Sequence, residues 1–299
     1  MEIIRSIEAF RLFRKDWPPS CTADLCFVPT MGALHAGHAS LIKNAQKRSQ
    51  YVVVSIFVNP TQFGQGEDYE EYPRPIKHDI DQLKMLGVRV VFAPLANQVY
   101  PPGFRTNITV GKWGRRLCGR SRPNHFLGVA TVVLKLFNIV CPTVAFFGQK
   151  DAQQVVLIKR MTQDLNLDIE IFVCPIIREK DGLAVSSRNR YLTVQERRAA
   201  VVLSQCLTWA TQEVEMGERN VQVLVKGIHK KIGEESLARL DYVSIVEPND
   251  LKPIRRLNKI SLLVFAVFIG KTRLIDNTIL WVEKVRGGKS YSISKESVL

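Results

Sequence analysis

The sequence lacks the motifs that identify several common classes of site. It has six cysteines, at positions 21, 26, 118, 141, 174 and 206, but no C-x-x-C pair, and their spacing matches neither a zinc site nor a dense disulfide framework. It also contains no G-x-G-x-x-G, no G-x-x-x-x-G-K-[ST] and no H-E-x-x-H. A dinucleotide fingerprint, a P-loop and a zincin site are therefore excluded, and reduced, mostly buried thiols are expected.

Long hydrophobic runs are absent as well. No segment reaches the roughly 18 to 20 apolar residues that a membrane-spanning helix needs, and the longest candidate, 260–270, reads as a buried strand. Residues 1–17 carry scattered charges and no continuous apolar stretch, so they do not resemble a secretory signal. We expect a cytoplasmic protein that neither spans nor anchors in a membrane.

Positive charge is abundant but dispersed. The net charge is +14, from 42 Lys and Arg against 28 Asp and Glu. The basic residues form no run interleaved with aromatic residues, so nucleic-acid binding is not expected as the main role. A basic cleft for a phosphorylated small molecule would account for part of the charge, and solvated surface for the rest.

Strand and helix patterns alternate over the first part of the chain, which predicts βαβ units and a parallel sheet. The apolar, β-branched runs are at 25–30, 51–59, 88–94, 143–148 and 168–176, and helical spacing is found at 38–49, 76–87, 129–140 and 152–165. Beyond about Arg178 we expect helices at 193–209 and 220–232 and strands at 241–247 and 260–270. The fold class is therefore α/β with a second, smaller α+β C-terminal domain, with boundaries at 1–178 and 179–285, and a polar tail at 286–299.

Unusual loops follow four of the predicted strands. They are PTMGALHAGH, NPTQFG, GQKD and REKDGLAVSSRN. Because ligands of parallel sheets bind at the carboxyl ends of the strands, we expect these loops to converge on one edge of the sheet.

Two histidines three residues apart, His35 and His38, lie where the first strand turns into a helix. Free N–H groups and the helix dipole favour anions at such a place, and two imidazoles could donate to phosphate oxygens. A lone H-x-x-H could equally be a pair of turn or capping residues.

Three other groups of residues have the same ambiguity when taken singly. Lys150 and Asp151 suit a phosphate and a ribose hydroxyl or magnesium, but could be surface residues, and either Gln153 or Gln154 could reach the same ligand. In SSRN, 186–189, the hydroxyls and the guanidinium suit a phosphate, although such turns are common. Asn59 and Gln62 could bind a small polar acid or could shape a turn. Together these groups indicate ATP-dependent nucleotidyl transfer to a small acid, through positioning and charge stabilisation.

Five segments together resemble the pantothenate synthetase (pantoate–β-alanine ligase) family. They are PTMGALHAGHASL, VSIFVNPTQFGQGEDYEEYPR, RPNHFLGVATVVLKLFN, FFGQKDAQQ and DGLAVSSRNRYL, and the resemblance runs to about Val282. It implies a homodimer with a Rossmann-like N-terminal domain that binds ATP and pantoate, and a small C-terminal lid. It also implies that pantoate reacts with Mg·ATP to give pantoyl adenylate and pyrophosphate, and that β-alanine then gives pantothenate and AMP.

The resemblance also implies the roles of individual residues. His35 and His38, with His38 as proton donor, and Lys150, Ser186, Ser187 and Arg188 would hold the phosphates. The rest of the ATP site would comprise Met31, Gly32, Gly148, Asp151, Ile177 and Val185. Gln62, Gln154 and Met31 would bind pantoate, and Arg122 would lie near the β-alanine carboxylate. We expect no direct metal ligand, since Mg²⁺ arrives with ATP, although Asp151 is a possible contact.

Four positions depart from the usual family pattern. Gln149 stands where the family commonly has Glu, Asn124 where glycine is frequent, Val185 where Met or Leu is frequent, and His78 where many members carry an acidic residue before Asp79. They affect expected affinities rather than the reaction. The alternative within the same superfamily is another H-x-G-H nucleotidyltransferase that acts on a different acid or alcohol, and it would not need Gln62 and Gln154 together. A basic nucleic-acid-binding module, the third hypothesis, would be indifferent to alanine at His38.

Overall fold

The computed structural model describes residues 1–17, 24–282 and 299. Its contacts divide the chain into two units. The first comprises Met1–Gly148 and Leu157–Cys174, and the second comprises Gln149–Val156 and Pro175–Leu299. The domain boundary proposed from the sequence at 178 stays a prediction. Of the expected tail at 286–299, only Leu299 lies among the described residues.

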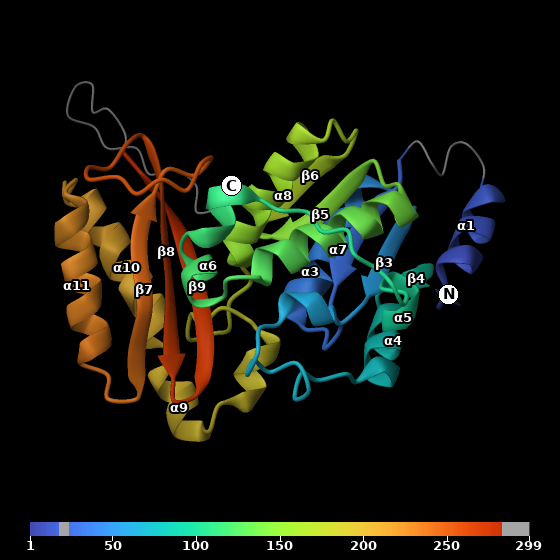
Figure 1. The fold of residues 1–299 in the computed structure, drawn as a ribbon. Helices are drawn as coiled ribbons and strands as arrows, with labels where there is room; N and C mark the ends of the chain where they lie inside the picture. The colour runs from blue at the N-terminus through green and yellow to red at the C-terminus, as the bar shows by residue number, and fades with distance from the viewer. Residues whose placement is uncertain (18–23, 283–298) are drawn as a thin grey trace. The chain divides into compact units, whose positions relative to one another are not determined.

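The first unit is built on a six-stranded sheet in the order β1-β4-β3-β2-β5-β6 (Figure 1). Every neighbouring pair is parallel. This confirms the α/β, Rossmann-like prediction. The strands are β1 (Glu2–Ile4), β2 (Cys26–Thr30), β3 (Val52–Ile56), β4 (Val90–Phe92), β5 (Val144–Gly148) and β6 (Glu170–Cys174).

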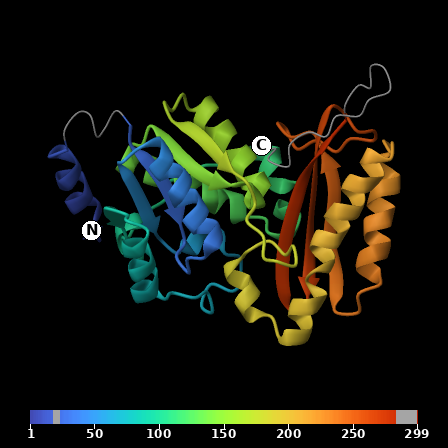
Figure 2. The ribbon, with the colours of Figure 1, turned by 180° about the vertical axis from the view of Figure 1, so that it is seen from behind.

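Helices cover both faces of this sheet, which is why its central strands are apolar without alternation. One face packs on Leu41, Ile42 and Ala45 of α3 (Ala36–Arg48) and on Leu83 of α4 (Ile76–Met85). On the other face, Phe10 of α1 (Ile7–Lys15) packs at a tilt against Phe92, and Phe137 of α7 (His125–Val140) packs edge-on against Phe27. The ribbon has α7 in front of the sheet in Figure 1 and α3 in front of it in Figure 2. The shorter elements are η1 (Pro60–Gln62), α5 (Ala96–Val99), η2 (Gly111–Arg115) and α6 (Cys118–Ser121).

The second unit contains a three-stranded antiparallel sheet, β7 (Ala238–Val246), β8 (Ile260–Ile269) and β9 (Thr272–Trp281), in the order β7-β8-β9. Its core joins Phe265 of β8 to Leu203 of α10 (Val202–Glu215) and Ile228 of α11 (Val221–Gly233). The unit also holds η3 (Gln149–Asp151), η4 (Ser187–Tyr191) and α9 (Val194–Ala199), and α8 (Ala152–Asp164) crosses the division between the units. This confirms the second, smaller α+β domain.

Several local predictions were wrong. β1, α1 and β9 were not predicted. β9 contains Asp276 and Asn277, which are buried at 2% exposure each because side-chain partners satisfy them. The single helix expected at 193–209 is two helices, α9 and α10. α7 begins at His125, four residues earlier than the apolar run suggested.

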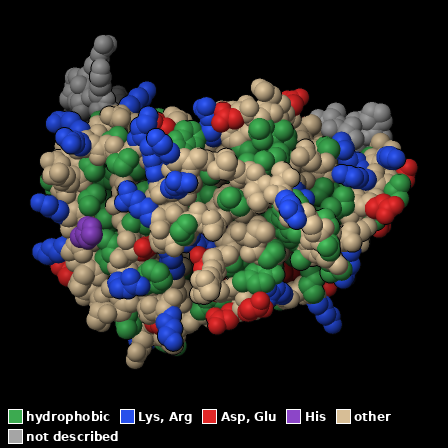
Figure 3. Space-filling model, viewed as in Figure 1, with side chains coloured by type: hydrophobic (Ala, Val, Ile, Leu, Met, Phe, Trp, Pro, Cys, Tyr) green, Lys and Arg blue, Asp and Glu red, His purple; other side chains and the backbone are tan. Residues whose placement is uncertain are grey.

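Among the described residues, no helix is long and apolar enough to cross a membrane. Lys and Arg side chains are spread over the visible surface with acidic and apolar residues among them (Figure 3). This agrees with the dispersed charge of the sequence.

Candidate functional site

The turn between β2 and α3 places both histidines at a helix N-terminus. His35 is the N-cap of α3, and its Nδ1 accepts a hydrogen bond from the Gly37 N–H over 3.2 Å. The rings of His35 and His38 stack with centroids 4.0 Å apart and planes at 26°. Because Nδ1 of His35 is an acceptor, the neutral ring carries its proton on Nε2. Capping and donation to an anion therefore use different nitrogens of the same ring.

A buried carboxylate fixes the shape of this turn. Gly32 and Ala33 both have positive φ, 79° and 49°. Asp79 of α4, only 1% exposed, accepts from the N–H groups of Ala33 and Leu34, each over 2.8 Å. A Cβ at Gly32 would lie 2.9 Å from Asp79 Oδ2. The carboxylate thus holds two consecutive left-handed residues immediately before Leu34 and His35.

Gln62 and Met31 are in contact. Asn59, 1% exposed, caps η1 and donates from Nδ2 to Gln62 Oε1 over 3.1 Å. Gln62 Nε2 then points to Met31 Sδ at 2.7 Å. The Gln62 amide is therefore oriented, with its NH₂ group turned toward Met31. Gly128 allows η1 to approach α7, because a Cβ there would lie 2.3 Å from the Thr61 carbonyl oxygen.

Arg122 lies beside Gln62 in a cluster with Glu67 and His125. Its Nε and Nη2 donate to the two oxygens of Glu67 over 2.7 and 2.6 Å, and Nη2 also donates to the Gln62 carbonyl oxygen over 3.3 Å. Burial alone would raise the pKa of Glu67, but the hydrogen bond and charge of Arg122, together with smaller contributions from the Gly64 backbone and His125, lower that pKa below its usual value. The carboxyl group is therefore held as the anion.

In the second unit, η3 presents Lys150 and Asp151 on a short turn that Asn277 of β9 supports. Asn277 Nδ2 donates to the carbonyl oxygens of Gln149 and Lys150, each over 3.0 Å, and its Oδ1 accepts from Gln149 Nε2 over 3.3 Å. Gln149 is buried, Lys150 is half-buried and Asp151 is exposed. Gln149 satisfies its amide within the fold, so the departure from the family's Glu leaves no unpaired charge there.

The segment that carries Ser186, Ser187 and Arg188 is anchored by an arginine. Arg178 forms two hydrogen bonds to Asp276, of 2.7 and 2.9 Å, and the Asp276 side chain is fully buried. The strand-like bridge from Arg178 to Ala184 and the hydrogen bond from the Val185 N–H to the Ile177 carbonyl oxygen, 2.9 Å, close the loop. Ser186 caps η4, and its Oγ accepts from the Arg188 N–H over 3.3 Å.

The predicted site residues divide between the two units. The first unit holds Met31, Gly32, His35, His38, Gln62, Arg122 and Gly148, and the second holds Lys150, Asp151, Gln154, Ile177, Val185, Ser186, Ser187 and Arg188. Within the first, the structure brings His35 to His38, and Met31 to Gln62. Within the second, Ile177 pairs with Val185 and Ser186 with Arg188.

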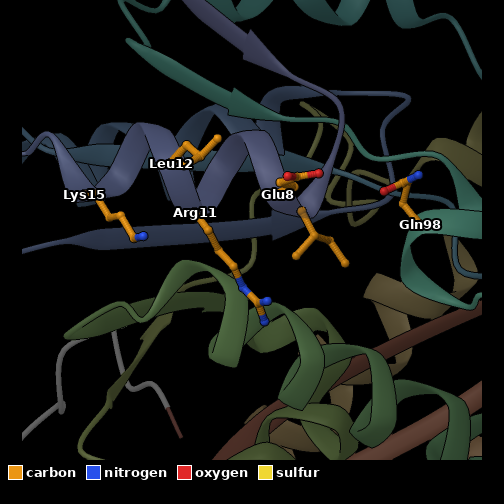
Figure 4. Close-up of a pocket in the computed structure, with 6 residues that line it drawn as sticks. Glu8, Arg11, Leu12, Lys15 and Gln98 are labelled. Atoms are coloured by element: carbon orange, nitrogen blue, oxygen red, sulfur yellow. The ribbon is translucent and has the colours of Figure 1, made fainter.

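Five residues that shape these groups were not predicted: Glu67, Asp79, His125, Arg178 and Asp276. Their roles become visible only in the structure, because each depends on burial and on contacts that the sequence does not show. No group of three or more His, Cys, Asp or Glu with metal-binding geometry occurs among the described residues. A shallow pocket of ≈ 440 Å³ lies against α1 and contains none of the predicted site residues; its walls are Ile7, Glu8, Arg11, Leu12, Lys15 and Gln98 (Figure 4).

Known proteins resemble this chain over nearly its whole length. The pantothenate synthetase of Thermosipho africanus (strain TCF52B) is 48% identical over 280 residues, which cover 94% of this chain and 100% of that protein. That of Heliobacterium modesticaldum (strain ATCC 51547 / Ice1) is 54% identical over 256 residues, which cover 86% and 91%.

Solved structures agree. The pantothenate synthetase of Thermus thermophilus superposes with a TM-score of 0.88 at 38% identity, covering 93% of this chain and 99% of that one. The pantoate–β-alanine ligase of Francisella tularensis, complexed with beta-gamma ATP and beta-alanine, gives 0.76 at 38% identity, covering 93% and 97%. The family model described as pantoate–β-alanine ligase matches residues 2–279. As its motifs predicted, the chain belongs to the pantoate–β-alanine ligase family and is an enzyme of that class.

Proposed function

We propose that this chain condenses pantoate with β-alanine to pantothenate, through pantoyl adenylate, with release of pyrophosphate and AMP. Membership of the family supports the overall reaction, and ATP and β-alanine are named as ligands of the Francisella tularensis relative. The observation in the fold that carries the proposal is the stacked His35–His38 pair at the N-terminus of α3.

In the first step, a carboxylate oxygen of pantoate forms a bond to the α-phosphorus of ATP, and the bond from that phosphorus to the bridging oxygen of pyrophosphate breaks. Negative charge accumulates on the departing pyrophosphate. Donors and cations fixed before the reaction stabilise that charge without reorganisation. His35 and His38 donate to phosphate oxygens, with His38 as the proton donor, and Lys150, Ser186, Ser187 and Arg188 hold the phosphates.

In the second step, the amine of β-alanine attacks the acyl carbon, and the bond from that carbon to the AMP oxygen breaks. The amine nitrogen loses a proton to solvent or to the departing phosphate as the amide forms. Gln62, Gln154 and Met31 bind the pantoyl group throughout. Arg122 binds the β-alanine carboxylate. Holding both substrates converts a bimolecular attack into a unimolecular one.

The nucleoside end of ATP is assigned to Met31, Gly32, Gly148, Asp151, Ile177 and Val185. Mg²⁺ is usually held by one or two carboxylates together with substrate phosphates rather than by a protein cage. Asp151, exposed at the end of η3 next to Lys150, is the carboxylate proposed to contact it. When bound with ATP, the ion neutralises phosphate charge.

We further propose that the protein works in the cytoplasm as a homodimer. The resemblance to the family supports the dimer. Light scattering during gel filtration measures it directly: a mass of twice 33.9 kDa is expected, and a monomer at micromolar concentration contradicts it.

Pantoate-dependent exchange between ATP and pyrophosphate, with magnesium present and β-alanine omitted, tests the first step. We expect exchange that requires pantoate and is lost in His38→Ala. His229→Ala is the matched control, because His229 is exposed on α11. Exchange that responds to another acid but not to pantoate would support a different H-x-G-H nucleotidyltransferase. Retention on DNA or RNA that weakens strongly with salt and is unchanged in His38→Ala would support the nucleic-acid module.

A further inference from the structure

The guanidinium group of Arg122 is already bound to a carboxylate of this chain. Nε and Nη2 donate to both oxygens of Glu67, and the two side chains are only 14% and 22% exposed. Two parallel N–H···O bonds are how arginine recognises a carboxylate. A second carboxylate cannot use the same edge of the guanidinium while Glu67 occupies it.

Arg122 has two anchors that do not depend on Glu67. Its Nη2 donates to the Gln62 carbonyl oxygen over 3.3 Å, and its Nη1 lies 3.2 Å from His125 Nε2. His125 Nδ1 lies 2.8 Å from the same carbonyl oxygen. Because a carbonyl oxygen only accepts, Nδ1 carries the proton, and Nε2 of the neutral ring accepts from Arg122. These contacts keep the guanidinium in place when Glu67 leaves.

Contacts within its own loop, residues 63–74, hold the backbone on the C-terminal side of Glu67. The Arg74 guanidinium donates to three carbonyl oxygens of the loop, those of Tyr69, Glu70 and Tyr72. The ring of Phe63 packs edge-on against Tyr69 and Tyr72. Glu67 can therefore turn away from Arg122 while the loop keeps its shape.

We propose that Glu67 competes with the carboxylate of β-alanine for Arg122, and thereby sets the β-alanine concentration at which the second step saturates. This inference rests on the proposed function, in which Arg122 binds that carboxylate. One carboxylate replaces another, so the charge at Arg122 is neutralised both before and after the exchange. The apparent dissociation constant for β-alanine equals the intrinsic constant divided by the fraction of molecules in which the Glu67–Arg122 pair is open.

The same competition shields Arg122 during the first step. Pantoate also carries a carboxylate, and an open guanidinium edge beside Gln62 would bind it, or any small acid, in the wrong place. Glu67 is attached to the protein and stays at high local concentration, so weak or misplaced acids do not displace it. Glu67 thus acts on selectivity as well as on the saturating concentration.

The test compares Glu67→Gln with Glu70→Gln. Glu70 lies in the same loop, is exposed, and uses only its carbonyl oxygen toward Arg74. The neutral amide that Glu67→Gln introduces would turn an N–H group toward an N–H of Arg122, so the pair opens. We expect the KM for β-alanine to fall about tenfold in Glu67→Gln, equivalent to about 1.4 kcal/mol, and to be unchanged in Glu70→Gln. Propionate, which is β-alanine without its amine, should inhibit about tenfold more strongly in Glu67→Gln.

A KM for β-alanine that rises or stays within twofold in Glu67→Gln overturns the proposal, because Glu67 then supports Arg122 instead of competing for it. Glu67→Asp, which keeps the charge but shortens the reach, provides a second variant should the first not fold, and its KM should fall as well. Arg122→Gln distinguishes the proposed binding of β-alanine by Arg122 from the competition by Glu67. If this variant has an unchanged KM for β-alanine, Arg122 does not bind β-alanine. Exchange of pyrophosphate without β-alanine reports the first step independently.

Discussion

Asp79→Asn should disable the turn that presents His35 and His38. In the native turn, both carboxylate oxygens accept backbone N–H groups over 2.8 Å, at 1% exposure. Asparagine keeps one acceptor and turns an NH₂ group toward the other buried N–H. The loss of one charge-assisted hydrogen bond, about 1.5–3 kcal/mol, adds to the weakening of the other, about 0.5–1.5 kcal/mol, while the neutral amide recovers part of the desolvation cost. We expect a destabilisation of about 2–4 kcal/mol.

The catalytic effect should be larger than the effect on stability suggests. Gly32 and Ala33 hold positive φ angles that the carboxylate maintains, and displacement of catalytic groups by about 1 Å can reduce a rate about 100-fold. We therefore expect pyrophosphate exchange to fall about 100-fold at temperatures where Asp79→Asn is fully folded. Denaturant titration measures the stability, and exchange at saturating pantoate measures the rate.

Asp81→Asn is the matched control, because Asp81 lies on the same helix with 55% of its side chain exposed and pairs only loosely with Lys84, at 3.7 Å. It should change stability by less than about 0.5 kcal/mol. A double-mutant cycle with Gly32→Ala should show coupling of at least about 0.5 kcal/mol, since the added Cβ would meet Asp79. Full exchange activity in a folded Asp79→Asn protein would refute the reasoning, even if stability fell.

Three further predictions concern other contacts. Gly128→Ala should push η1 away from α7, because its Cβ would lie 2.3 Å from the Thr61 carbonyl oxygen; we expect a loss of about 1–3 kcal/mol and a higher KM for pantoate, whereas Gly233→Ala, with nothing within 4 Å, should be neutral. Asp276→Asn should leave Arg178 half-paired, lower stability by about 2–3 kcal/mol and raise the KM for ATP, measured by exchange; an unchanged KM would contradict it. Burial raises the pKa of Cys26, Cys174 and Cys206 to about 11 from 9.0. In a Cys21→Ser background, a disulfide reagent at pH 8 should therefore label exposed Cys141 first. The free energy of unfolding should fall as the pH rises from about 9 to 11, because the unfolded thiols ionise first; equal labelling of all thiols would contradict this.

The sequence predicted the strands of the parallel sheet because apolar, β-branched runs are a direct consequence of burial on both faces. It singled out the loops that follow these strands because their polar and charged side chains are uncommon at positions that serve packing alone. It could not predict that Asp79 holds the histidine turn, because more than forty residues separate the two in the chain. In addition, a carboxylate in an amphipathic helix is ordinarily expected to be exposed to solvent. β9 was missed for a related reason, because Asp276 and Asn277 interrupt its apolar pattern and only their partners explain their burial.

The local structure explains why two of the departures from the family pattern, at His78 and Asn124, are tolerated. His78 precedes Asp79 and pairs with Gln82 at 3.0 Å on the outer side of α4, so a charge there has no part in holding the turn. Asn124 is the N-cap residue of α7 but makes no side-chain capping bond, and its φ of −102° is one that any residue adopts. Replacing glycine by Asn124 therefore costs the backbone nothing at this position.

Two buried carboxylates shape the loops proposed to bind phosphate, although a triphosphate would repel a carboxylate that faced it. Asp79 directs both of its oxygens to backbone N–H groups, and Asp276 directs both of its oxygens to Arg178. Each carboxylate therefore has its charge compensated by donors from the segment that it positions. This arrangement lets a strongly attractive ionic contact fix a loop while the cations and imidazoles of that loop stay available for the substrate. The functional cations can then be few, and the net charge of +14 need not be concentrated at the site.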